Sequence, residues 1–306
     1  MDLEQQSAYY LDLARQMLDE AQGDDRQQWI SRIASEFPQI KRVIAWLKDQ
    51  GDTEQGLELA YYLQELWFED QYTDEGLEIL QDFLAIDPPQ ESSVMRAMCL
   101  DLAGGLAIHA NKLELAHSLK KQAITIFRKL GNQRQLGYAL LHYGHLVGYA
   151  QGLHNKAELS YGEALEIFTS LADAWGIAHA SGNLASVKLE LGDYATAQEL
   201  VNESLNRYSE LNSDWDLALT LATAAGVAAV QGRFKDAVLL AAASSAHRER
   251  IGVTLPNKYK SRFQQIEEDA LRGLEEEQRS VLWARGRSMK MVEAVNYALS
   301  NQKTSR

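Results

Sequence analysis

The sequence predicts an all-α fold: a right-handed superhelical solenoid of antiparallel helix pairs with helical caps. Three observations predict it. A small residue recurs at Gly76, Ala116, Ala157, Ala197 and Ala237, in steps of 40, 41, 40 and 40. Apolar residues follow each of these anchors at helical spacing. No segment shows the alternation of β-branched residues that would indicate a strand. A fixed period of this size is typical of repeat arrays.

The residues before each anchor predict a tight turn between two helices. Five positions upstream stand Asn111, Gly152, Gly192 and Gly232, residue types that adopt left-handed backbone conformations at low cost. The clearest copies read GDYATA at 192–197 and GRFKDA at 232–237. The aromatic residue is expected to fill the helix pair, and the small anchor to let the two helices approach closely.

The residues after each anchor predict the buried face of the second helix. At offset 8 stand Leu84, Ile124, Leu165 and Leu205; at offset 11, Phe127, Phe168 and Tyr208; at offset 14, Leu130, Leu171, Leu211 and Ile251. These offsets trace one face of a helix. Small residues in the first helix, Gly104, Gly144, Ala185 and Ala225, mark its crossing with the partner. This is the tetratricopeptide pattern, with helices longer than in the usual unit of about 34 residues.

We expect three regions along the chain. Residues 1–52 form N-terminal helices that enter the array, residues 53–252 form five tetratricopeptide-like repeats, and residues 253–306 form a C-terminal helical cap. Tyr9 is expected to face inward in the first helix. All four prolines, Pro38, Pro88, Pro89 and Pro256, are expected at helix boundaries, with Pro38 in the first turn of a new helix.

Composition and charge narrow the function classes. The net charge is −13, and residues 1–91 carry 21 acidic and 6 basic side chains. This acidic third should repel nucleic acid and could attract a basic partner, although a solvated surface explains it equally well. A single cysteine, Cys99, allows no disulfide within the chain. Without a signal peptide or an apolar run of membrane-spanning length, we expect a cytoplasmic protein without membrane contact.

The sequence carries no catalytic or cofactor motif. It contains no Gly-Lys dipeptide and hence no phosphate-binding loop, and neither a zinc-protease nor a nucleophile-elbow motif occurs. His142 and His145 make only half of a metal site. We therefore expect no enzyme activity, no cofactor and no metal.

The register instead places a set of polar and aromatic residues on the inner wall formed by the first helix of each repeat. They are Tyr61, Glu65, Glu69, Asp101, His109, His142, Tyr149, His179, Ser186 and Glu190. Such a wall suits recognition of a peptide or a polar ligand. The alternative is that these side chains cap or pack between neighbouring helices. Trp175 and Trp215, at equivalent positions, are expected to pack between repeats.

Three stretches resemble the C-terminal tetratricopeptide region of bacterial signal-transduction ATPases with numerous domains, including predicted ATPases and LuxR-type or antibiotic-regulatory transcription regulators. They are WISRIASEFPQIKRVIAWLKDQGD at 29–52, the repeats, and the tail over 239–299 with Trp283, Gly286, Glu293, Ala294 and Ala298 in order. The resemblance implies a sensor or scaffold module that restrains or releases an attached effector. Because these residues include no nucleotide-binding domain, ATPase and DNA-binding roles are not carried over.

The leading hypothesis is a non-catalytic scaffold or sensor whose concave groove binds a protein, a peptide or a small inducer. One alternative is a structural, autoinhibitory arm for a nucleotide-binding domain, with no ligand of its own. Another is a regulator similar to peptide-pheromone receptors. Residues 1–50 show no clear basic recognition helix, which ranks this second alternative lower and agrees with no direct nucleic acid binding.

Overall fold

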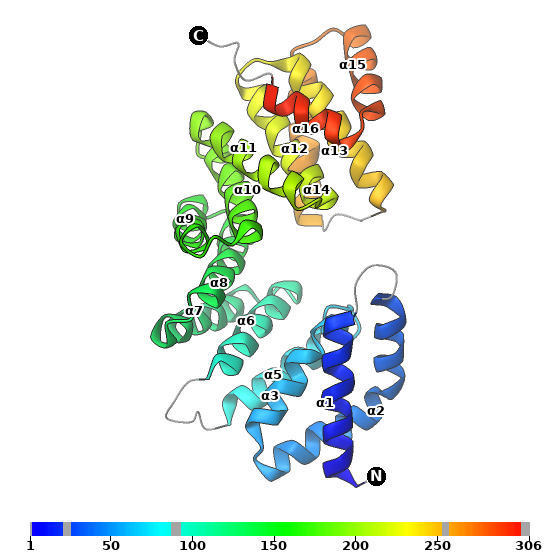
Figure 1. The fold of residues 1–306 in the computed structure, drawn as a ribbon, viewed down its shortest axis with the longest axis vertical. Helices are drawn as coiled ribbons and strands as arrows, with labels where there is room; N and C mark the ends of the chain where they lie inside the picture. The colour runs from blue at the N-terminus through cyan, green and yellow to red at the C-terminus, as the bar shows by residue number, and fades with distance from the viewer. Residues whose placement is uncertain (1, 21–25, 87–92, 253–256, 301–306) are drawn as a thin grey trace. The chain divides into compact units, whose positions relative to one another are not determined.

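The computed structural model describes residues 2–20, 26–86, 93–252 and 257–300; the side chains of residues 149, 150 and 257–263 also lie outside the description. Within these ranges the chain folds into helices joined by turns, without strands (Figure 1). The prediction of an all-α fold is confirmed. Pro88, Pro89 and Pro256, predicted at helix boundaries, lie outside the described residues.

The chain divides into two compact units, residues 1–146 and 147–306, which we describe separately. The first contains α1 (Leu3–Glu20), α2 (Arg26–Gln50), α3 (Thr53–Tyr62), α4 (Gln64–Trp67), α5 (Thr73–Ala85), α6 (Val94–His109), α7 (Leu113–Leu130) and α8 (Gln133–His145). A π-helical turn, η2 (Leu146–Ala150), follows α8. The second contains α9 (His154–Ser170), α10 (Ala174–Glu190), α11 (Tyr194–Glu210), α12 (Asp214–Val230), α13 (Phe234–Ile251), α14 (Asn257–Arg272), α15 (Glu276–Ser288) and α16 (Met291–Ser300).

Helix length and turn geometry produce the period. Helices α9 to α12 each have 17 residues, and three-residue connections separate α10, α11 and α12, which accounts for the 40-residue step. The first helix of each pair ends at a left-handed residue, as predicted: Asn111, Gly152, Gly192 and Gly232. The structure adds a second series after the second helices: Gly131, Ala172, Asn212 and Gly252. Every connection in the regular repeats therefore turns at one left-handed residue.

The alanine anchors lie in the core. Ala116, Ala157, Ala197 and Ala237 are each 0% exposed, and the offset-11 residues Phe127, Phe168 and Tyr208 are buried behind them. The offset-14 residues were predicted to be buried, and this is wrong: Leu130, Leu171, Leu211 and Ile251 are about 40% exposed. They sit immediately before the left-handed residue, where the backbone is already leaving the helix.

The first repeat departs from the regular pattern because of one buried side chain. Trp67 is fully buried, and its indole nitrogen donates a hydrogen bond to the Ala60 carbonyl at 2.7 Å. That carbonyl would otherwise accept from the backbone of Gln64, so the first helix breaks at Leu63 into α3 and α4. Trp67 then packs on the anchor Gly76, where a Cβ would lie 2.6 Å from the indole ring.

Two expectations for residues 1–52 are wrong. Pro38 does not start a helix but lies inside α2, whose buried stripe continues through Ile33, Phe37 and Ile40. Burial of this stripe outweighs the hydrogen bond that the proline forfeits. Tyr9 is 38% exposed and its neighbour Tyr10 is buried instead. The Asp52 side chain caps α3, the helix at which the array is expected to start, by accepting from the backbone of Gln55.

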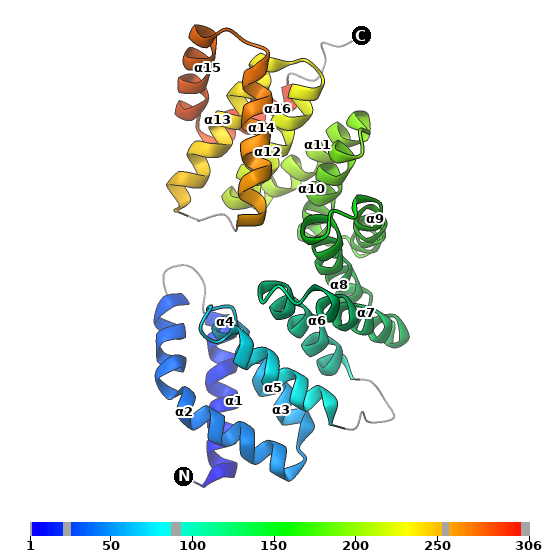
Figure 2. The same cartoon turned by 180° about the vertical axis from the view of Figure 1, so that it is seen from behind.

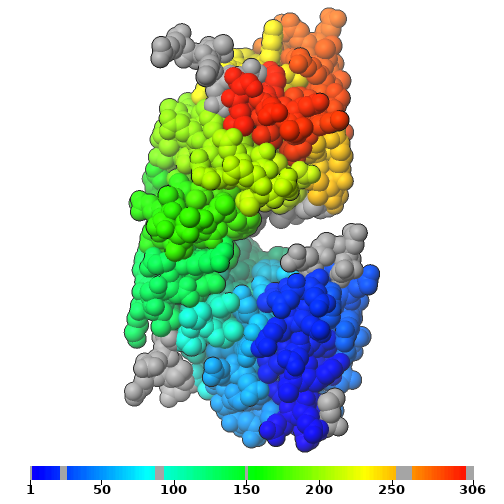
Figure 3. All heavy atoms as spheres, viewed as in Figure 1, coloured from blue at the N-terminus to red at the C-terminus, as the bar shows by residue number. Residues whose placement is uncertain are grey.

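The helices of the tail pack onto α12 and α13. Helices α14 and α16 lie on opposite faces of the α12–α13 pair, as Figures 1 and 2 show together. In the space-filling view α16 lies against α11 and α12 (Figure 3). Helix α15 approaches α13 so closely that a Cβ on Gly286 would lie 2.5 Å from the Leu239 carbonyl oxygen.

Ala172 stands where the equivalent repeats use glycine or asparagine, and its φ is 51°. A Cβ in this region costs about 1–2 kcal/mol. We predict that Ala172→Gly raises the free energy of unfolding by about 0.5–1 kcal/mol after the entropy lost to the more flexible unfolded chain, measured by urea denaturation. Gly131→Ala, the reverse change at the equivalent turn, should lower it by about 1 kcal/mol. A loss of stability in Ala172→Gly would contradict the assignment of strain.

Candidate functional site

The predicted wall residues fall into both units. Tyr61, Glu65, Glu69, Asp101, His109 and His142 belong to the first unit, and Tyr149, His179, Ser186 and Glu190 to the second. The side chain of Tyr149 lies outside the described residues. The candidate residues therefore form two separate groups, one in each unit.

The first unit contains a cluster of three charged or polar side chains from three successive helices. The Lys120 ammonium of α7 lies 2.7 Å from Asp101 Oδ1 of α6 and also donates to the Asp101 backbone carbonyl at 2.8 Å. The other carboxylate oxygen of Asp101 lies 2.5 Å from His142 Nδ1 of α8. We call these residues the Lys120–Asp101–His142 cluster. It links the second and third repeats.

Burial in the cluster decreases from lysine to histidine. The side chain of Lys120 is 3% exposed, that of Asp101 15% and that of His142 47%. Gly104 makes room for the lysine, because a Cβ there would lie 2.7 Å from Lys120 Cγ. Burial alone would raise the pKa of Asp101, but His142 and Lys120 outweigh burial and hold the pKa of this carboxyl far below its usual range. Asp101 is thus an ionised acceptor.

This ionised acceptor fixes the orientation of the His142 ring. Because a carboxylate can only accept, His142 Nδ1 must carry the proton that it shares with Asp101. The second ring nitrogen, Nε2, is left for another partner on a half-exposed side chain. A histidine held in one orientation by a buried carboxylate is well suited to directional binding.

Tyr61 lies at the position in the first repeat equivalent to Asp101 and His142 in the next two. Burial raises its pKa and the Asp101 charge adds to the effect, so the hydroxyl stays protonated at neutral pH. Glu65 and Glu69 are engaged within the chain: Arg26 of α2 lies 2.7 Å from Glu65 and 3.5 Å from Glu69. Tyr61, Asp101 and His142 therefore form one polar row, with both glutamates tied to α2.

His109 makes a separate set of contacts. Its Nδ1 lies 3.1 Å from the Thr73 hydroxyl, which also lies 2.9 Å from the Trp67 carbonyl. Since the hydroxyl has one proton to donate and the carbonyl can only accept, Nδ1 of His109 is the donor. Nε2 faces Asp70 at 3.5 Å, and the ring meets Phe68 edge-on. His109 therefore fastens the end of α6 to the α4–α5 connection.

In the second unit the candidates are mostly engaged between helices. His179 Nδ1 lies 3.0 Å from the hydroxyl of buried Tyr208 in α11, and its ring stacks on Trp175 at 4.7 Å. Ser186 was predicted on the open wall, and this is wrong: it is 5% exposed and its hydroxyl lies 3.1 Å from that of Thr223 in α12. Small residues let α10 and α12 approach, which covers this position. Glu190 is exposed.

The two tryptophans lie against their own helices. Trp175 is 40% exposed and stacks on His179, four residues further along α10. Trp215 packs with Leu219 and Ala222 of α12. These contacts lie within one helix, so the packing of the tryptophans between repeats stays a prediction.

Lys120 was not predicted as a site residue, although the sequence contains a signal for it. Lys120 stands four residues after its anchor, at a position occupied by Leu80, Tyr161, Val201 and Ala241 in the other repeats. A lysine at a position that is otherwise apolar requires a buried counter-charge. This departure from the apolar pattern of the repeats indicates a buried carboxylate near Lys120, which in the structure is Asp101.

Among the described residues, no group of three or more His, Cys, Asp or Glu side chains is arranged to hold a metal ion. Nor does any described helix combine the length and apolar character needed to cross a membrane.

Comparison with known proteins identifies the fold. No protein-family model and no curated protein matches the chain. The solved structures to which the chain is similar include the following three. BtubC (BKLC) from P. vanneervenii is 18% identical, with a TM-score of 0.57, over 84% of this chain and 95% of that chain. The apo form of RapI is 13% identical, with a TM-score of 0.58, over 97% and 92%.

The third is a putative kinesin light chain of Podosopora anserina with nearly identical TPR-like repeats. It is 15% identical, with a TM-score of 0.53, over 66% of this chain and 97% of that chain. At these identities the likeness establishes the fold alone. The chain is a tetratricopeptide-like helical repeat protein, as its sequence predicts.

We predict that Asp101→Asn lowers the free energy of unfolding by about 3 kcal/mol, because it leaves the buried Lys120 ammonium without a counter-charge. Lys120→Met removes that ammonium, so the double variant Lys120→Met/Asp101→Asn should recover much of the loss. Urea denaturation of the four proteins gives the coupling energy. Strictly additive losses would show that the two charges do not depend on each other.

The lowered pKa of Asp101 also predicts a pH dependence. A carboxyl with a depressed folded pKa contributes stability that is present above its unfolded value, here 3.8, and is lost as the pH falls through the folded pKa. The difference in unfolding free energy between the wild type and Asp101→Asn should therefore be constant near neutral pH and shrink below pH 3.8. Denaturation curves over this range test it; a difference that shrinks already near pH 6 would assign the effect to another group.

Proposed function

We propose that this protein is a non-catalytic scaffold or sensor that binds a polar peptide or protein segment on the first helices of its repeats. The observation that carries the proposal is the Lys120–Asp101–His142 cluster. Its most exposed member is His142, the only one whose side chain is about half accessible. The ligand would therefore contact His142 Nε2, with the Tyr61 hydroxyl in the same polar row.

Stability alone does not explain this cluster. Burying an ammonium and a carboxylate has a desolvation cost that the attraction between them offsets only partly, and apolar side chains of similar volume often stabilise as well or better. The other repeats place apolar residues at the position of Lys120. A fixed histidine in return supplies a directional polar contact, which is what a recognition surface requires.

The acidic first third of the chain argues for a protein or peptide rather than nucleic acid as the partner. A small inducer remains an alternative ligand of the same polar row. The resemblance of the repeats and tail to bacterial signalling ATPases and transcription regulators supports a regulatory setting, in which binding restrains or releases an effector.

The proposal predicts that His142→Ala weakens ligand binding. Peptides selected from a random library on the full chain would be measured by calorimetry against the wild type and the variant. Loss of one hydrogen bond to a charged or oriented group costs about 1.5–3 kcal/mol, so the dissociation constant should rise by roughly 10- to 100-fold. Tyr61→Phe should have a smaller effect in the same direction.

Lys121→Ala is the matched control, because Lys121 is the exposed neighbour of Lys120 on the same helix. Its affinity should equal that of the wild type. The proposal fails if no peptide is enriched, or if the selected peptides bind His142→Ala and the wild type equally while both remain folded.

A further inference from the structure

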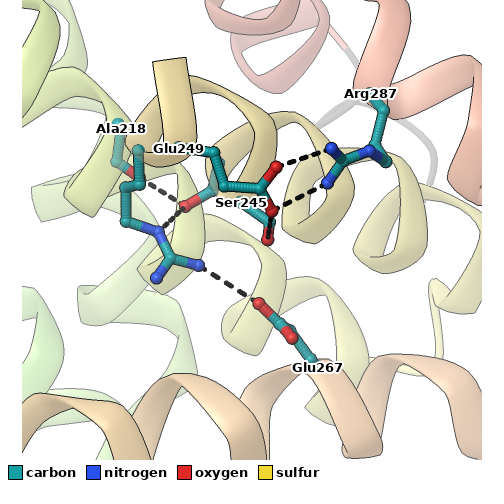
Figure 4. Close-up of polar contacts among 7 residues, drawn as sticks. Ala218, Ser245, Glu249, Glu267 and Arg287 are labelled. Carbon is teal, nitrogen blue, oxygen red and sulfur yellow. Dashed lines mark hydrogen bonds and ion pairs between the residues drawn. The ribbon is translucent and has the colours of Figure 1, made fainter. Parts of the chain in front are cut away.

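Four consecutive residues at the end of α13, His247 to Arg250, hold the C-terminal cap. Arg248 lies 3.1 Å from Glu267 of α14. Glu249 accepts two hydrogen bonds from the Arg287 guanidinium of α15, at 2.9 and 2.6 Å. Figure 4 shows Glu249 and Arg287 facing each other, with Glu267 on a separate helix. One turn of α13 thus contacts both α14 and α15.

The same turn also caps the C-terminus of α15. The last carbonyls of a helix lack partners within it. Arg250 donates to the Arg287 carbonyl at 2.6 Å, and His247 Nε2 lies 3.1 Å from the carbonyl of Met289, the residue that follows α15. Side chains of α13 therefore satisfy the end of α15, and a cation near this negative helix end is favourable.

These contacts require a neutral His247. The Met289 carbonyl can only accept, so His247 Nε2 carries a proton. One nitrogen of the Arg250 guanidinium, which can only donate, lies 3.4 Å from His247 Nδ1 and 3.5 Å from Nε2, so the guanidinium sits beside the ring. With the proton of Nε2 given to the Met289 carbonyl, Nδ1 is the ring atom that can accept from Arg250, and its protonation would place two positive charges in contact.

The surroundings of His247 favour the neutral form. The side chain is 8% exposed. Burial lowers its pKa, and the Arg250 charge lowers it further, while the Met289 carbonyl and Asp214 of α12 partly oppose both. Among the described residues, Arg250 and Asp214 are the charged groups that act on the ring.

We propose that His247 and Arg250 form a pH-sensitive latch, which holds α15 and α16 on α13 while the imidazole is neutral and loosens when it is protonated. Loosening uncovers the face of α13 around Leu239 and Ala242, on which Gly286 now packs. The latch would thereby control access to an apolar surface at the end of the array.

The sign follows from linkage. With the pKa lowered in the closed state, an opened cap takes up the proton more readily as the pH falls below 6.5, the ordinary value for histidine. The closed state loses stability from there down to its own lower pKa. A single proton changes the open fraction by at most about tenfold per pH unit.

The nearby carboxylates, Glu249 and Glu267, change protonation at another pH or affect another helix than His247 does. Arg287 holds the pKa of Glu249 below its usual range, so this ion pair survives into more acidic solution than the latch. Burial raises the pKa of Glu267, but Glu267 lies on α14 and contacts α13 through Arg248. Changes due to Glu267 should thus appear in α14, and changes due to His247 in α15 and α16.

Hydrogen exchange of the full chain, followed by mass spectrometry at about pH 7.5 and about pH 5.5, tests the latch. Protection factors, corrected for intrinsic exchange, should fall in residues 276–300 at the lower pH by up to about tenfold per pH unit. In His247→Gln the amide can still donate to the Met289 carbonyl but takes up no proton, so protection should be independent of pH. His154→Gln, which removes a histidine of α9 outside the cap, is the control and should show the same pH response of residues 276–300 as the wild type.

If His247→Gln does not fold, a second variant, Arg250→Gln, tests the same proposal. Arg250→Gln keeps a donor for the Arg287 carbonyl but removes the charge that opposes the imidazolium, which brings the closed-state pKa of His247 nearer to its ordinary value, so the loss of protection at low pH should be smaller than in the wild type. Equal wild-type protection of residues 276–300 at both pH values would overturn the proposal. So would the same pH response in His247→Gln as in the wild type.

Discussion

The close approach of two helices at one small residue is the constraint on which the rest of this structure depends. Ala116, Ala157, Ala197 and Ala237 are completely buried, and the aromatic side chains of each second helix pack behind them. A larger anchor would separate the pair and move every later contact out of phase. Because each connection also turns at one left-handed residue, the same geometry recurs and the apolar faces of successive pairs remain aligned.

The sequence predicts what is local and repeated. Helix pairs, first-series turns and anchors follow from spacing, because each depends on residues close together in the chain. Pro38 and Ser186 show where this reasoning fails. A buried stripe carries α2 through the proline, and a neighbouring helix covers the serine. Both outcomes depend on packing between segments that local propensity does not contain. The prediction that Leu130 and its equivalents are buried is wrong for a different reason, because helical spacing does not show where the helix ends.

The candidate site was predictable only in part. The register places Asp101 and His142 at equivalent positions of neighbouring repeats, and the structure brings them to 2.5 Å. The register does not reveal that Lys120 contacts Asp101, because the repeat pattern of the second helix predicts only its apolar face. Likewise, the cap was expected, but its attachment through His247 and Arg250 was not. From sequence alone, charged residues at a helix end are expected to be solvated, because the segment that they contact is not known.

The buried lysine has a consequence for how such an array can change over time. Lys120, Asp101 and Gly104 depend on one another, since the carboxylate balances the ammonium and the glycine leaves space for its stem. A change at one of them alone is penalised, so the three should be replaced together or not at all. All three lie in the second repeat, on α6 and α7. The second repeat can therefore be exchanged for a neighbouring copy only as a whole, whereas an exchange whose border falls between α6 and α7 would separate the ammonium from its carboxylate.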